Sequence, residues 1–90
     1  MGTALIKIKI MPKSPDVDLK EIENQAKNII SEQQGEKTKL EREPVAFGIN
    51  AIIATFARDE TLESDTLLKK LQEIANVSSA EVIDFRRAFG

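Results

Sequence analysis

Residues 3–11 read TALIKIKIM, and this stretch defines the first element of the fold. Its small and β-branched residues recur at every second position, and lysines stand at positions 7 and 9 between them; the apolar set is Ala4, Ile6, Ile8 and Ile10. A period of two with β-branched residues is typical of a strand that buries one face. Prolines at positions 12 and 15 cannot continue a strand ladder, so we expect the strand to end there.

A helical pattern follows this strand. Its apolar residues share one helical stripe and predict a buried face: Leu19, Ile22, Ala26, Ile29 and Ile30. Asp16 and Asp18 are both candidates for the N-cap, and Glu21 follows Asp18 at the spacing of a capping box. Gly35 is expected to end the helix.

Two strands are expected next. Residues 37–43, KTKLERE, are polar apart from Leu40, which predicts an edge strand whose charges discourage pairing with another chain. Residues 47–58 are apolar on both faces except at Asn50, which predicts a central strand. Alanine-rich apolar runs also form helices, but the β-branched isoleucines in this run favour a strand.

A second helix and a last strand complete the pattern. Ser64 is a candidate N-cap, Asn76 a candidate stop, and the apolar residues between them recur at helical spacing: Leu67, Leu68, Leu71, Ile74 and Ala75. Residues 80–87, AEVIDFRR, are predicted to form the final strand, with Ile83 and Phe85 on the same side.

The predicted order is therefore β-α-β-β-α-β. This order folds as a ferredoxin-like α+β sandwich, a four-stranded antiparallel sheet with both helices on one face. Ninety residues have room for a single core, so we expect one domain spanning 1–90. The architecture hosts many unrelated activities, and function has to be argued from particular residues.

The composition excludes several kinds of site. The chain has no cysteine and no histidine, which removes thiolate and imidazole metal ligands and the usual nucleophile–histidine pairs. The four glycines stand apart, so the sequence has no glycine-rich loop of the kind that cradles a phosphate. We therefore expect no cofactor, no metal site and no enzymatic activity. The net charge of −2 also argues against direct binding to nucleic acid.

The longest uncharged stretch, Pro44 to Ala57, is too short to cross a bilayer. The N-terminus lacks the charged and apolar regions of a signal peptide. We expect a cytoplasmic protein without membrane contact that is a monomer when free.

Two places in the chain invite a functional interpretation. Phe47 could pack on the core where its strand begins, with Gly48 permitting a close backbone approach, or it could be an exposed anchor for a protein partner. Arg86 and Arg87 could form a solvated end, or could project towards an acidic or phosphate-bearing partner, to which the arginine fork is suited. The residues alone leave both choices open.

Three blocks closely resemble archaeal elongation factor 1-beta, in order along the whole chain. They are IKIKIMPKSPDVDL at 6–19, EPVAFGINAIIATF at 43–56 and VSSAEVIDFRR at 77–87. That family comprises the guanine nucleotide exchange factors for elongation factor 1-alpha. The resemblance implies that the protein binds the GTPase domain of elongation factor 1-alpha and disturbs its phosphate and magnesium site, without chemistry on the nucleotide.

The resemblance also implies partner-binding residues. In the similar eukaryotic domain, the phenylalanine that matches Phe47 contacts the GTPase, and Gly48 belongs to the same block. A lysine near that domain's C-terminus reaches the magnesium site, and it matches Arg87, with Arg86 as the neighbouring alternative. This sequence departs from the pattern by carrying arginine, and by continuing through residues 88–90. Because the guanidinium is larger than an ammonium, contact with the phosphate loop or switches is expected more than displacement of magnesium.

Two other functions share this fold, a ligand-binding regulatory module and an RNA-binding domain. The first is disfavoured by the absence of a glycine-rich ligand loop. The second is disfavoured because the sheet strands lack the aromatic motif on which bases stack.

Overall fold

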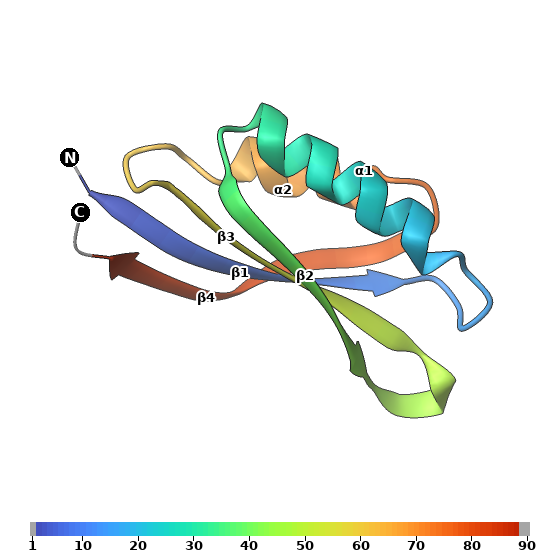
Figure 1. The fold of residues 1–90 in the computed structure, drawn as a ribbon. Helices are drawn as coiled ribbons and strands as arrows, with labels where there is room; N and C mark the ends of the chain where they lie inside the picture. Colours follow the sequence, from blue (N-terminus) through green and yellow to red (C-terminus); the bar gives the residue numbers. More distant parts are fainter. Residues whose placement is uncertain (1, 89–90) are drawn as a thin grey trace.

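The structure is a computed structural model, and it describes residues 2–88. The elements in chain order are β1 (Thr3–Pro12), α1 (Leu19–Glu32), β2 (Glu36–Pro44), the short 3-10 helix η1 (Ala46–Gly48), β3 (Asn50–Asp59), α2 (Asp65–Gln72) and β4 (Val77–Ala88). The strands form one antiparallel sheet in the order β2-β3-β1-β4 (Figure 1). The predicted element order and ferredoxin-like α+β fold are confirmed.

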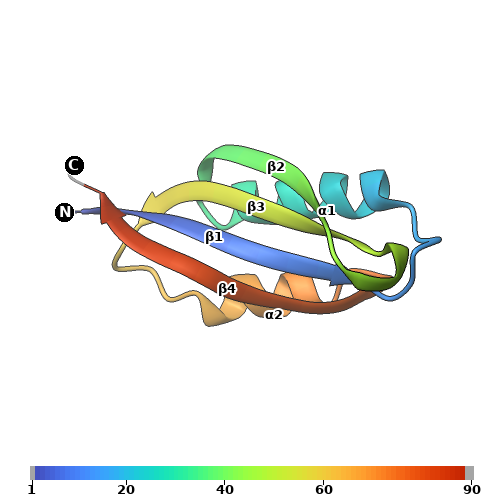
Figure 2. The same ribbon diagram turned by 90° about the horizontal axis from the view of Figure 1, so that it is seen from below.

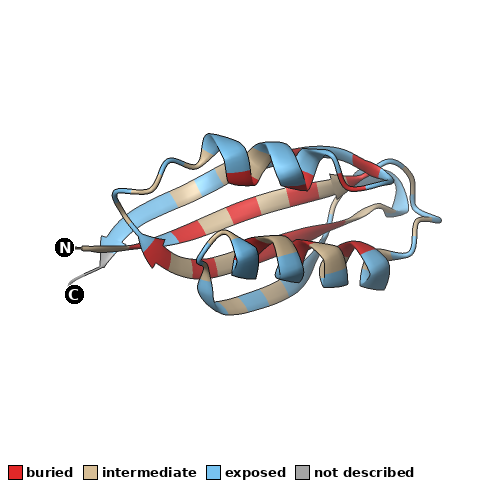
Figure 3. Cartoon of the chain, turned by 90° about the horizontal axis from the view of Figure 1, so that it is seen from above, coloured by how far each residue is buried: buried red, intermediate tan, exposed pale blue. Residues whose placement is uncertain are grey.

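Both helices cover the same face of the sheet, and the other face carries none (Figures 1 and 2). We call these the helix side and the outer face. The alternation predicted for β1 is confirmed, because Ile6 is paired with Phe56, Ile8 with Ala54 and Ile10 with Ile52, all buried on the helix side. These side chains pack in one core with residues of the two helices: Ile22, Ala26, Ile30, Leu67 and Leu71. Figure 3 shows buried positions on both helices and on the strands that they cover.

The start of α1 resolves the choice between two aspartates. Asp18 is the N-cap, and its Oδ1 accepts a hydrogen bond of 3.0 Å from the amide of Lys20. Such a bond satisfies one of the amides that a helix leaves unpaired at its start. Glu21 does not complete the capping box in this conformation, because its carboxylate accepts instead from the side chain of Gln25.

The helix α1 ends close to Gly35, as predicted, but Gly35 is not the left-handed residue that ends it. The left-handed residue is Gln34, with φ of 69°, and the amide of Gly35 donates to the carbonyl of Ile30 at 2.7 Å. This is the hydrogen-bond pattern of a Schellman motif. Glycine is required at position 35 for space, because a Cβ there would meet the side chain of Ile30 and lie 3.1 Å from the Phe56 ring.

The second helix is shorter than its sequence pattern predicts. Ser64 occupies the N-cap position, yet its side chain makes no capping bond, and Glu63 accepts from the amide of Thr66 instead. The helix ends at Gln72, so Ala75 falls in the following turn and is exposed rather than buried. Asn76 takes a left-handed conformation, φ 71°, just before β4 begins.

Two strand boundaries also differ from the prediction. β3 begins at Asn50 and not at position 47, because the preceding residues turn through η1. β4 begins at Val77 and not at position 80, since Val77 and Ala80 both reach the core.

The prediction that Ile83 and Phe85 share a side is wrong. The register of β4 against β1 shifts between Lys7 and Ile8, which marks a β-bulge in β4 near Ile83. Phe85 is paired with Ile6 and therefore faces the helix side, whereas Ile83 lines a hollow of the outer face together with Ile53.

Candidate functional site

The turn between β2 and β3 projects one aromatic side chain into solvent. Phe47 is 92% exposed, the most exposed large apolar residue of the described chain. The turn is closed by hydrogen bonds from the amide of Val45 to the carbonyl of Ile49, 2.8 Å, and from the amide of Ile49 to the carbonyl of Ala46, 3.3 Å. The core-packing interpretation of Phe47 is therefore wrong, and the side chain is available to a partner.

The backbone of this turn explains the glycine next to the phenylalanine. Phe47 and Gly48 both have left-handed backbones, with φ of 62° and 73°. Glycine adopts this conformation without steric cost, whereas a residue with a Cβ does not. A Cβ at Gly48 would meet nothing within 4 Å, so glycine serves the backbone angle and not a close approach. The strained residue is Phe47.

The two arginines lie at the end of β4 and point to different faces. Arg86 is paired with Leu5 on the outer face, and Arg87 is paired with Ala4 on the helix side. Each guanidinium forms an exposed ion pair of 3.0 Å, Arg86 with Asp84 and Arg87 with Glu60. Exposed pairs of this kind contribute little to stability, so both cations can exchange partners readily.

The structure does not bring the phenylalanine and the arginines together. Arg86 is level with Ala57 across β1, whereas Phe47 precedes the first residue of β3, Asn50. The seven-residue step from Asn50 to Ala57 corresponds to about 23 Å of strand. Figure 1 shows the η1 turn and the end of β4 at opposite ends of the molecule. A partner that touches both must extend along the long axis of the sheet.

The outer face connects these two ends. A hollow of about 350 Å³ lies on it, next to the turn, and is lined by Lys7, Glu41, Arg42, Glu43, Pro44, Ile53 and Ile83. Its apolar floor is Ile53 and Ile83, and its rim carries charges of both signs. Leu5 and Ile83 are roughly half exposed on this face. A mixed apolar and charged surface suits a protein partner better than a uniformly anionic nucleic acid.

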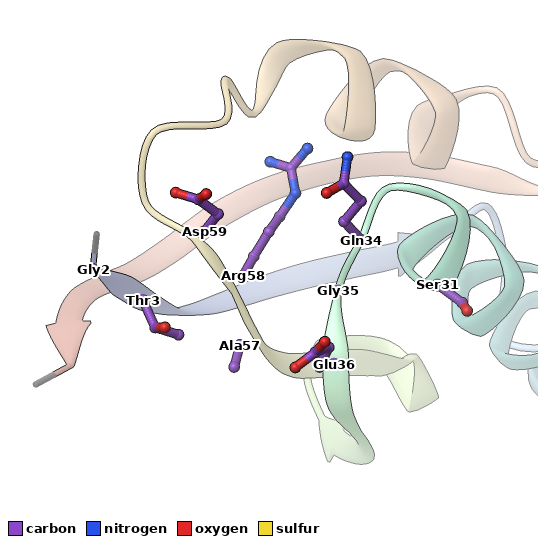
Figure 4. A pocket seen from close by; sticks show the side chains of 9 residues that line it. All are labelled: Gly2, Thr3, Ser31, Gln34, Gly35, Glu36, Ala57, Arg58 and Asp59. Atoms are coloured by element: carbon purple, nitrogen blue, oxygen red, sulfur yellow. The ribbon is translucent and has the colours of Figure 1, made fainter. Parts of the chain in front are cut away.

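A larger hollow of about 590 Å³ lies at the end of the sheet away from the turn, around Arg58 (Figure 4). Arg58 is only 5% exposed; its Nε donates to the carbonyl of Gln33 at 2.7 Å, and its Nη1 to the carbonyl of Glu63 at 3.0 Å. The guanidinium thus joins the end of α1, the segment before α2 and β3. This is a structural role, and the donors named here are already satisfied.

The burial of Arg58 was not predicted, although the sequence contains a signal for it. Positions 52, 54, 56 and 58 share the helix side of β3 at a period of two. The stripe therefore ends in an arginine that must be buried and must find acceptors. The first helix has no basic residue in its last turn, and a cation next to its terminal carbonyls compensates for this.

Hydrogen bonds favour the ionised form of two carboxylates next to α2, Asp59 and Glu63. Hydrogen bonds from the amide and hydroxyl of Thr61 lower the pKa of Asp59. Hydrogen bonds from Thr66 lower the pKa of Glu63. A general acid needs the opposite shift. Within residues 2–88, no group of three or more acidic residues could hold a metal ion, and no helix is long and apolar enough to cross a membrane.

Comparison with known proteins gives consistent matches over nearly the whole chain. The family described as the EF-1 guanine nucleotide exchange domain matches residues 5–88. Elongation factor 1-beta of Pyrococcus horikoshii is 46% identical over 77 residues, which cover 83% of this chain and 84% of that protein. Elongation factor 1-beta of Methanothermobacter thermautotrophicus is 36% identical over 88 residues, covering 97% and 98%. The protein of the same name in Nanoarchaeum equitans is 37% identical over 82 residues, covering 90% and 100%.

Proposed function

The chain belongs to the family of EF-1 guanine nucleotide exchange domains and is a nucleotide exchange factor of the elongation factor 1-beta type, and from this we propose how it acts. Its partner is elongation factor 1-alpha. It binds the GTPase domain of that protein, disturbs the phosphate and magnesium site, and so hastens the release of GDP. It performs no chemistry on the nucleotide and works in the cytoplasm, where translation takes place.

Phe47 is the observation that carries the proposal. The Phe47 side chain is 92% exposed, on a turn that is already closed by two hydrogen bonds. Its burial therefore contributes almost nothing to the stability of the free protein. Aromatic side chains that enter a pocket of a partner commonly dominate the binding energy. A non-glycine residue held in the left-handed region also fits this role, since such strain persists mainly at functional sites.

The arginines provide the second contact. Arg86 and Arg87 project from the strand end at the far side of the sheet, and their forks suit phosphate or carboxylate groups. Because they point to opposite faces, only one of them can face a given partner surface directly. Arg86 shares the outer face with the hollow that leads to the turn, which favours it as the residue that reaches the nucleotide site.

The coupling between factor and nucleotide follows from linkage. If the bound factor weakens the affinity for GDP by some ratio, then GDP weakens the affinity for the factor by the same ratio. A rebinding nucleotide therefore expels the factor, and a small amount of factor can serve many partner molecules.

Release of a fluorescent GDP from elongation factor 1-alpha tests the proposal. Wild-type protein should accelerate release, and Phe47→Ala and Arg86→Ala should each reduce the acceleration by about tenfold or more, as expected for the loss of a main anchor. Lys69→Ala is the control, because Lys69 is also an exposed cation but lies on α2, which covers the opposite face of the sheet. If wild type leaves the release rate unchanged, the proposed partner is wrong. If only Arg87→Ala reduces the rate, the assignment of Arg86 is wrong.

A further inference from the structure

Strand β4 is an edge that the described chain leaves open. It has 12 residues and is paired with β1 alone. Open edges are usually protected by proline, lysine or a β-bulge, and β4 has only the last of these, the bulge near Ile83. The opposite edge, β2, has such protection, since Lys37 has a left-handed backbone and Pro44 ends the strand. β4 contains neither proline nor lysine, and Ile83 and Phe85 on it are about half exposed.

The bulge near Ile83 changes which residues share a face. Before the bulge, Glu81 is paired with Lys9 on the outer face. After it, Arg86 is paired with Leu5, also on the outer face. In a regular strand, residues five positions apart would point to opposite faces. In β4 the extra residue places an acidic and a basic side chain on the same face, on either side of the bulge.

This arrangement is complementary to itself. When two β4 strands run antiparallel around a two-fold axis between Ile83 and Asp84, Glu81 of each copy lies opposite Arg86 of the second copy on the outer face. On the helix side, Val82 of each copy lies opposite Phe85 of the second copy, and both residues of that pair face the helix side in the register with β1. Opposite charges and apolar pairs at directly opposed positions both stabilise an antiparallel ladder.

We propose that two copies of this protein associate through β4 in this register and join their sheets into one. The interface is isologous, as two-fold symmetry requires. It consists of a single strand edge with its flanking side chains, and interfaces of such small size are weak. The dimer therefore forms at high protein concentration and coexists with the monomer expected from the sequence at low concentration.

The dimer also affects nucleotide exchange, and only this effect rests on the proposed function. Arg86 engages Glu81 of the second copy instead of Asp84 and is no longer available to the GTPase. Self-association and partner binding then compete for the same side chain, and the dimer is a reserve form that does not act on the partner.

Charge reversal tests the register without reference to exchange. Sedimentation velocity over a range of concentrations should show wild type shifting from monomer to dimer. Glu81→Arg and Arg86→Glu should each weaken self-association at least about tenfold, because each places like charges opposite each other twice. An equimolar mixture of the two variants should dimerise like wild type, since both contacts of the mixed dimer then join opposite charges. Native mass spectrometry identifies the mixed dimer by its mass.

The control variant is Glu41→Arg, an exposed acid on the outer face of the opposite edge strand. It should leave dimer formation unchanged. The proposal is overturned if wild type stays monomeric at all concentrations, if the mixture of reversed variants fails to dimerise, or if Glu41→Arg abolishes the dimer. Exchange activity enters none of these results, so the register and the proposed function can fail separately.

Discussion

Replacing Phe47 by glycine should stabilise the fold while it impairs exchange. The left-handed backbone, φ 62° and ψ 33°, costs a residue with a Cβ about 1–2 kcal/mol. Glycine removes this cost, but its freedom in the unfolded chain returns about 0.5–1 kcal/mol. The side chain is 92% exposed, so its loss removes at most about 0.3 kcal/mol of burial. The expected net gain in the free energy of unfolding is about 0.2–1 kcal/mol, or about 1–8 °C in melting temperature for a domain of this size.

Thermal unfolding followed by circular dichroism, together with the release of fluorescent GDP, separates the two effects. Phe47→Ala keeps the Cβ and the strain, so its melting temperature should stay within about 2 °C of wild type. The matched control is Phe56→Ala, because Phe56 is 1% exposed in the core. This change should cost about 3–5 kcal/mol.

A clear result would refute this reasoning. If Phe47→Gly and Phe47→Ala lower the melting temperature as far as Phe56→Ala does, Phe47 packs against the protein and is no anchor. If both keep full exchange activity, the turn is strained for another reason.

Three further substitutions test the contributions of single residues to the stability of the fold. Arg58→Met should lower the free energy of unfolding by about 2–4 kcal/mol, measured by urea titration, because it leaves the carbonyls of Gln33 and Glu63 unpaired. Gly35→Ala should destabilise by about 1–3 kcal/mol in the same titration, because the added methyl group meets the Ile30 and Phe56 side chains. The lowered pKa of Asp59 stabilises the fold above its unfolded-state pKa and stops doing so as the pH falls below about 4. The melting temperature of Asp59→Asn should therefore approach that of wild type on acidification, and a constant difference between them would contradict this.

Most of the fold follows from periodicity, and its failures have physical causes. The alternation around Ile6 and Ile8 predicts β1 correctly, because successive side chains of a strand point to opposite faces and only one face of β1 is buried. The same rule fails at Ile83 and Phe85, where one inserted residue reverses the alternation. A bulge is set by the pairing with β1 and leaves no local signature in the strand itself.

The candidate site was only partly accessible from the sequence. The resemblance indicated Phe47 as a contact residue, and its exposure supports this, whereas local patterns alone placed it in a strand. The left-handed backbone conformation of Phe47 could not be predicted from the sequence, because phenylalanine does not favour this conformation. The separation of Phe47 from Arg86 was equally hidden, since it depends on which strand ends meet, and that is a property of the assembled sheet.

That separation has a consequence for how a partner is recognised. In the proposed complex, Phe47 and Arg86 are the two arms of a bivalent interaction, that is, two separate contact sites on one protein. The strands of the sheet hold them at a fixed separation. Once one arm is bound, the other is presented to its contact at a high effective concentration, so two weak contacts give firm binding. The gain vanishes when the partner's two contact points move out of register with the arms. The protein therefore binds only those partner conformations in which the contact points for Phe47 and Arg86 lie at the right distance from each other. A domain motion in the partner that changes this distance is enough to release the protein.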